Sequence, residues 1–248
     1  MWIALLLLAA AGQTPAVETG SLVERARAVA LSDRPQAEAL LRQALAAYEK
    51  EASKSAEYAA ALDLLGMTLY PSLAANKEAL TTQIEPLFKK ALELRQADPG
   101  VSPASKALAL ELEAMLLEAT GRLDDSRDPK SKARALRDQI ITAMQPPAED
   151  LIAGSTHIGP TIEPPQLMAR ADPAFTFESR LLKLAVTDVM AEVIIGTDGL
   201  IHQIEIFRPA GFGLDESAVQ ALMQWRFKPA RKNGAPIPVE GNIKLRFR

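Results

Sequence analysis

The 248-residue sequence has no cysteine and only two histidines, His157 and His202. Missing cysteine excludes a disulfide framework, thiolate zinc ligands and a cysteine nucleophile. Two histidines are too few for a histidine-rich metal site. Aromatic residues make up 5% of the chain, and the formal net charge of −3 provides no global basic field for nucleic acid. Hydrophobic residues still reach 48%, so the chain can build a folded core.

Composition changes along the chain. Residues 21–145 contain 26 alanines, 6 prolines and 3 glycines, whereas residues 146–248 contain 12, 10 and 8. Alanine favours helices, while aromatic and β-branched residues punctuated by glycine and proline favour sheets. Two domains of different class are therefore predicted, an all-α domain followed by a small α+β domain.

The amino terminus begins with an uninterrupted apolar run, residues 2–11. The run is too short for a membrane span, which needs about 20 residues, and suits the hydrophobic region of a secretory signal. We predict that residues 1–20 form a signal peptide or short apolar leader. The alternative is a helix that packs onto the first domain.

Residues 21–145 carry repeated apolar stripes at helical spacing. Asp98-Pro99-Gly100 marks a turn, and Ser102-Pro103 and Asp128-Pro129 both have the pattern of an N-cap followed by proline. The stripes are Ala37, Leu40, Leu41, Ala44, Leu45 and Tyr48; Tyr58, Leu62, Leu65 and Leu69; Ile84, Leu87, Phe88, Ala91 and Leu92; Leu108, Leu112, Met115 and Ala119; and Ala133, Leu136, Ile140 and Met144.

These helices resemble tetratricopeptide repeats, which are helical hairpins with small residues where the two helices meet. Leu65-Gly66 with Leu69-Tyr70 is similar to the first-helix signature, and Phe88 with Ala91 to the second. Stacked hairpins of this type form a groove that binds protein segments. A generic alanine-rich bundle, acting as a spacer or dimerisation element, is the alternative.

Residues 146–164 have the composition of an extended linker, with Gln145-Pro146-Pro147 ending the last helix. His157 lies in this segment, and we interpret it as a solvated loop residue.

The last part of the chain predicts the order strand, strand, helix, strand. Residues 189–195 and 200–207 alternate around the turn Gly196-Thr197-Asp198-Gly199, which places Ile204 and Ile206 on one face of the second strand and Ile201 on the other. A helix follows Leu214, with Asp215 and Glu216 suited to its positive end. Residues 237–247 form the final strand.

Four motifs follow one another in order: Gly196-Thr197-Asp198-Gly199, Gly213-Leu214-Asp215-Glu216-Ser217-Ala218-Val219, Trp225-Arg226-Phe227-Lys228-Pro229-Ala230 and Asn233-Gly234-Ala235-Pro236-Ile237-Pro238-Val239. Together they resemble the carboxy-terminal domain of TonB-family proteins, over residues 165–248. Asp172-Pro173 stands where the family usually has Tyr-Pro, and Asp188 replaces a usual glycine. The family-motif residues, to which we assign structural roles, are Gly196, Asp198, Gly199, Gly213, Leu214, Asp215, Trp225, Phe227, Pro229 and Gly234.

The resemblance implies a module that pairs an extended partner segment with its last strand by β-augmentation. Lys244 and Arg246 either select an acidic partner or protect the edge against aggregation. The implied partner-binding residues are Val239, Gly241, Asn242, Ile243, Lys244, Leu245, Arg246 and Phe247.

The function predicted from these features is non-enzymatic. Ser217 has no histidine near it in sequence, and the sequence contains no phosphate loop or dinucleotide motif. We predict a periplasmic or envelope protein without cofactor or metal, whose partners are an outer-membrane transporter segment or another envelope protein, and not nucleic acid or a small molecule. An energy transducer coupling an inner-membrane motor to outer-membrane transport is the main alternative, and a hydrolase is the second.

Overall fold

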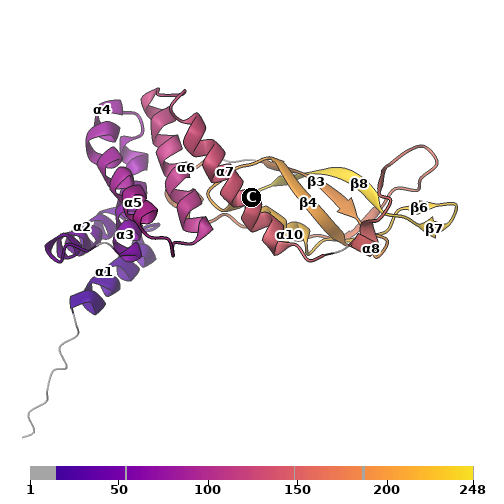
Figure 1. Ribbon diagram of the computed structural model, residues 1–248, viewed down its shortest axis with the longest axis horizontal. Helices are drawn as coiled ribbons and strands as arrows, with labels where there is room; N and C mark the ends of the chain where they lie inside the picture. Colours follow the sequence, from indigo (N-terminus) through magenta and orange to yellow (C-terminus); the bar gives the residue numbers. More distant parts are fainter. Residues whose placement is uncertain (1–14, 54, 148, 186–187, 248) are drawn as a thin grey trace, which may run out of the picture.

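The computed structural model describes residues 15–53, 55–147, 149–185 and 188–247. Most of the helices lie at one end of the elongated molecule and the main sheet at the other, with the helix α7 (Arg127–Met144) between them (Figure 1). The predicted class is confirmed: a helical region precedes a small α+β domain with antiparallel strands. The prediction of a leader falls mainly on residues 1–14, which lie outside the described residues.

The helical region consists of antiparallel neighbours joined by short turns (Figure 1). A π-helix, η1, joins α4 to α5. The helices are α1 (Pro15–Val29), α2 (Arg34–Lys50), α3 (Ala56–Leu73), α4 (Lys77–Ala79), η1 (Leu80–Ile84), α5 (Glu85–Ala97), α6 (Pro103–Thr120), α7 (Arg127–Met144), α8 (Glu149–Ile152), α9 (Phe177–Leu181) and α10 (Leu214–Leu222).

Local capping explains several helix starts. The Ser102 hydroxyl accepts a hydrogen bond from the N–H of Ser105 at 3.2 Å, as the Ser-Pro pattern predicts. The prediction of a second N-cap at Asp128 is wrong, because α7 already begins at Arg127. Pro129 then lies in the first turn, where its missing N–H would have no intrahelical partner.

The buried face of α7 also differs from the predicted stripe. Arg137 and Ile141 are buried with Ala133, whereas Leu136 and Ile140 are half-buried. Apolar periodicity did not include Arg137, because an arginine is buried only when charged partners are brought to it.

The main sheet has the strand order β1-β8-β3-β4. The predicted order strand, strand, helix, strand corresponds to β3, β4, α10 and β8. The strands are β1 (Thr156–His157), β2 (Gln166–Ala169), β3 (Asp188–Ile195), β4 (Ile201–Arg208), β5 (Arg226–Lys228), β6 (Arg231–Lys232), β7 (Ala235–Pro236) and β8 (Val239–Arg246).

A bulge in β4 corrects the predicted faces of that strand. Val193 lies opposite Ile204, but Ile195 lies opposite Ile201, so β4 has one extra residue in this interval. Because the extra residue reverses the alternation, Ile201 and Ile204 are both buried.

Two hydrophobic clusters form the core, and each includes residues from the other end of the molecule. Leu181 and Leu182 pack with the helical region, although they follow the predicted linker. Ile141 of α7 packs with the sheet. The helical region and the α+β domain are thus joined by shared packing.

Candidate partner-binding edge and its surroundings

Strand β8 lies near one edge of the main sheet. It pairs antiparallel with β3 along its whole length, from Val239 to Arg246. On its other side, the described residues supply only β1, which pairs in parallel with Val239 and Glu240. A strand directs half of its backbone groups to each side. The outward backbone groups from Gly241 to Arg246 therefore have no strand partner within the described part of the chain.

The pairing of β1 with β8 is reinforced by side chains. Ser155 Oγ donates a hydrogen bond to Glu240 Oε1 at 2.8 Å, and His157 Nδ1 lies 3.2 Å from Glu240 Oε2. The interpretation of His157 as a loop residue is therefore corrected: its side chain is exposed, but its backbone belongs to β1. The open part of the edge begins at Gly241, two residues after the predicted start at Val239.

The predicted edge residues fall on two faces. Val239, Leu245 and Phe247 are buried, and the ring of Phe247 lies 5.4 Å from that of Phe175. Asn242 is exposed, while Gly241 and Ile243 are half-buried. The core-facing side chains thus hold the strand on the domain, while its outward backbone groups from Gly241 have no strand partner among the described residues.

Charged side chains on β8 share one carboxylate. Lys244 Nζ lies 2.8 Å from Asp188 Oδ2, and Arg246 Nε lies 3.4 Å from Asp188 Oδ1. The hydrogen bond from Lys244 and the nearby positive charges lower the pKa of Asp188. Asp188 therefore remains ionised and compensates about half of this positive charge.

The opposite edge of the sheet, along β4, is covered by α7 and the residue that follows it. Gln145 Nε2 donates to the carbonyl of Ile204 at 2.9 Å, and the N–H of Ile204 donates to Gln145 Oε1 at 2.7 Å. The Arg134 guanidinium donates to the carbonyl of Ile206. Side chains here replace a neighbouring strand, so β8 offers the more accessible edge.

The motif residues have structural roles that the contacts explain. A Cβ on Gly199 would lie 2.0 Å from the carbonyl oxygen of Phe227, whose N–H donates to the Gly199 carbonyl at 2.8 Å. His202 Nε2 lies 3.0 Å from both carboxylate oxygens of Asp198. Trp225 Nε1 donates to the carbonyl of Ala171 at 2.8 Å.

The remaining motif residues shape the loops around α10 and the β6–β7 hairpin. Gly213 and Gly234 have positive φ values of 76° and 82°, which glycine adopts without strain. Leu214 is fully buried, and Ala230 is buried just after Pro229. Asp215 accepts hydrogen bonds from the N–H groups of Ala210 and Gly211. Burial raises the pKa of Asp215, and these two donors oppose that rise.

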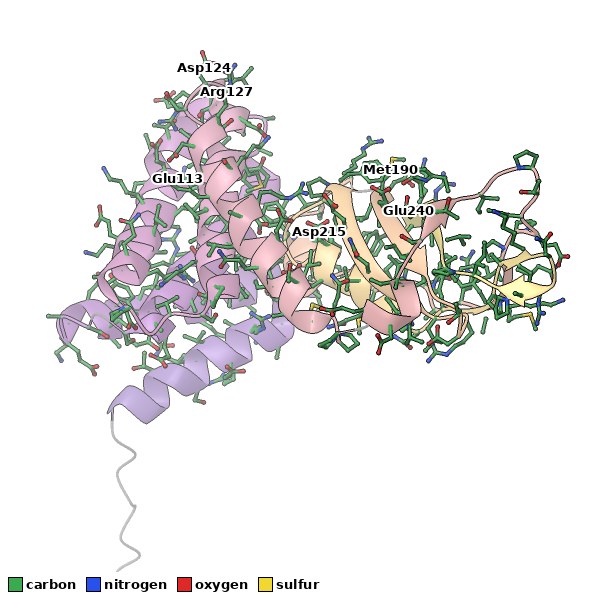
Figure 2. All side chains as sticks on the ribbon, turned by 45° about the vertical axis from the view of Figure 1, so that its right-hand side comes forward. Glu113, Asp124, Arg127, Met190, Asp215 and Glu240 are labelled. Atoms are coloured by element: carbon green, nitrogen blue, oxygen red, sulfur yellow. The ribbon has the colours of Figure 1, made fainter. Side chains whose placement is uncertain are left out.

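A buried ion cluster joins the helices to the α+β domain. Arg137 of α7 contacts Glu111 of α6 at 2.7 Å and Glu216 of α10 at 2.8 Å. Figure 2 places the neighbouring Asp215 where the helices meet the sheet. Burial raises the pKa of Glu111, and Arg137 opposes that rise. No sequence pattern indicated this cluster, because Arg137 lies 26 and 79 positions from the two glutamates that it contacts.

Groups that could support other chemistry are used structurally. Ser217 Oγ donates to the carbonyl of Ala174 at 2.7 Å and accepts from the same residue's N–H. Within the described residues, no group of three or more His, Cys, Asp or Glu side chains is arranged to hold a metal ion.

No described helix combines the length and the apolar character that crossing a membrane requires.

Comparison with known families identifies the class of the carboxy-terminal domain. Residues 186–248 match the family model described as Gram-negative bacterial TonB protein C-terminal. This part of the chain is similar to TonB carboxy-terminal domains, a family of energy-transduction and binding domains found in proteins of the Gram-negative envelope. No curated protein matches the sequence.

Proposed function

We propose that the chain is a non-enzymatic envelope protein that binds an extended segment of a protein partner along β8. The observation that carries this proposal is the outward side of Gly241–Arg246, which has no strand partner among the described residues. An added strand would complete the backbone hydrogen bonds, and side chains would determine which partner is accepted. A transporter segment and another envelope protein are both suitable partners.

The contacts at the other sheet edge, along β4, favour β8 as the strand to which a partner binds. A partner strand on β4 would have to displace the hydrogen bonds that Gln145 makes with Ile204. A partner strand on β8 would displace no strand pairing from Gly241 onward among the described residues. The difference favours one docking edge on the domain.

The helical region is proposed to provide a second protein contact, as a hairpin scaffold of the tetratricopeptide type. Close helix packing supports this part of the proposal, since a Cβ on Gly66 of α3 would lie 2.2 Å from the ring of Phe88 on α5. The predicted domain limits, 21–145 and 165–248, the signal peptide at 1–20 and the periplasmic location belong to the same proposal. Sequencing the amino terminus of the mature protein tests the leader.

Site-specific photocrosslinking in cell envelopes tests the docking edge. We expect a crosslinker at Asn242 to yield one discrete adduct, and a crosslinker at the exposed Gln220 of α10 to yield none of the same size. Equal labelling from both positions would contradict docking at β8.

Proline substitution then tests the backbone pairing. Ile243→Pro and Lys244→Pro remove N–H donors from opposite sides of the strand. The variant that keeps the higher unfolding midpoint has lost the outward donor, and we expect it to lose the Asn242 adduct. An undiminished adduct in that variant would overturn edge-strand binding.

A further inference from the structure

A small pocket lies beside the carboxyl end of β8. Its volume is about 190 Å³, the space of roughly six water molecules at ~30 Å³ each. The pocket therefore has room for one amino-acid side chain. Its lining includes Arg170, Asp172, Pro173, Trp225, Lys244 and Arg246.

The pocket is formed by three residues of β8 and by segments outside the main sheet. Strand β3 pairs with β8 on one side, and none of the described lining residues belongs to β3. We therefore assign the pocket to the side of β8 where a partner strand would lie. A strand added along Gly241–Arg246 would pass the pocket and direct alternate side chains to each of its own faces. One of these side chains would meet the pocket.

The pocket wall is fixed before a partner arrives. The Trp225 indole is held by its hydrogen bond to Ala171, at 2.8 Å. The Trp225 and Phe227 rings also pack together, with centroids 6.1 Å apart. A preformed wall reduces the entropic cost of binding.

Charges around the pocket do not balance. Three cations, Arg170, Lys244 and Arg246, lie in its lining. Asp172 pairs with Arg170, and the single carboxylate of Asp188 contacts both Lys244 and Arg246. Three positive charges thus meet two negative charges. One further carboxylate would complete the set.

We propose that this pocket is a subsite for one acidic side chain, Asp or Glu, on the extended partner segment bound along β8. The inference rests on the proposed function and adds the chemistry of the partner. The incoming carboxylate accepts charge-assisted hydrogen bonds, and the indole wall shields them from water. Arg170, Asp172 and Pro173 lie outside residues 186–248, so this subsite uses residues beyond the matched domain.

Synthetic peptides test the charge preference directly. The probes are end-blocked seven-residue peptides of alternating Val and Thr, in which one Thr is replaced by Glu, Gln or Lys at each position in turn. Binding of each peptide to the full chain is measured by titration. Changes in the NMR chemical shifts of backbone amides show where on the chain the peptide binds. At one position we expect Glu to bind about tenfold more tightly than Gln, and Lys more weakly than both. In 1 M salt the preference should fall to about twofold or less.

Two variants with the same change in charge separate the subsite from general attraction. We expect Arg170→Gln to abolish the preference for Glu and Lys232→Gln, on the exposed β6–β7 hairpin, to retain it. Equal binding of Glu and Gln peptides, with β8 amides shifting, would overturn the acidic subsite alone. A preference that survives Arg170→Gln would do the same. If no peptide shifts the β8 amides, edge-strand binding fails, and the subsite fails with it.

Discussion

The side chain of Gln145 is hydrogen-bonded to both backbone groups of Ile204, as an adjacent strand residue would be. The amide donates to the carbonyl at 2.9 Å and accepts from the N–H at 2.7 Å. The residue that follows α7 therefore occupies part of one sheet edge, while the other edge has no strand partner from Gly241 onward among the described residues. This asymmetry is the basis on which we propose β8 as the docking edge.

Replacing Gln145 should expose the β4 edge. Gln145→Ala removes both side-chain hydrogen bonds to Ile204 and a third to the carbonyl of Ile141, and we expect a loss of about 1–3 kcal/mol in unfolding free energy. Amide exchange at Ile204 should accelerate. Gln139→Ala, on an exposed part of the same helix, is the matched control and should change stability by less than about 0.5 kcal/mol. Equal effects of the two variants would contradict a specific role for Gln145.

Arg137 should contribute strongly to the stability of the packing between the helical region and the α+β domain. Arg137→Met leaves Glu111 and Glu216 buried without their cation, so we expect a loss of about 3–5 kcal/mol in chemical denaturation. Arg127→Met breaks only an exposed pair with Asp124 at the tip of α7 (Figure 2) and should cost less than about 1 kcal/mol.

A charge-neutral cluster provides the second arm of that experiment. The triple variant Arg137→Met, Glu111→Gln, Glu216→Gln should recover part of the lost stability, because no uncompensated buried charge remains. A triple variant that is less stable than Arg137→Met would show that the carboxylates do not account for the loss.

A buried carboxyl in the helical region should make stability depend on pH. Asp63 of α3 is 2% exposed and lies 2.6 Å from Arg95 of α5. Burial raises the pKa of Asp63 from 3.8 to about 7, although Arg95 opposes the rise. The folded state then binds more protons than the unfolded state between these values. Stability from this group is therefore present below about pH 4 and is lost as the pH rises to about 7.

The Asp63→Asn variant isolates that contribution. We expect its unfolding free energy to fall less between pH 4 and pH 7 than that of the native chain, measured by denaturant titration at each pH. Asp150→Asn, an exposed substitution on α8, should keep the native slope. An unchanged slope in Asp63→Asn would contradict the raised pKa.

Alanine substitutions at two glycines with similar backbone angles can separate the cost of backbone strain from the cost of a steric clash. Gly199 has φ +77° and Gly234 has φ +82°, but only Gly199 faces a close atom, the Phe227 carbonyl oxygen. Gly234→Ala should cost about 1–2 kcal/mol from the positive φ alone. Gly199→Ala should lower the unfolding free energy by at least about 1 kcal/mol more, because the backbone of Phe227 must move to make room for the added methyl group. Equal thermal shifts would show that the close approach relaxes freely.

Local chemistry in the sequence determined much of the secondary structure. The Ser102-Pro103 pattern correctly predicted the start of α6, and the turn at Gly196–Gly199 correctly predicted the hairpin of β3 and β4. The ordered motifs also indicated the TonB-type domain, which the family match confirms. Such signals depend on residues a few positions apart, so a sequence shows them directly.

Only the tertiary structure shows which sheet edge is covered by other parts of the chain. The contacts of Gln145 with Ile204 and of Ser155 with Glu240 join residues 59 and 85 positions apart. Arg137 became buried because folding brought two distant carboxylates to it. The bulge in β4 likewise arose from pairing with β3, which alternation in one strand does not reveal. Sequence pattern therefore predicted β3, β4 and β8, while long-range packing determined which edge lacks a strand partner among the described residues.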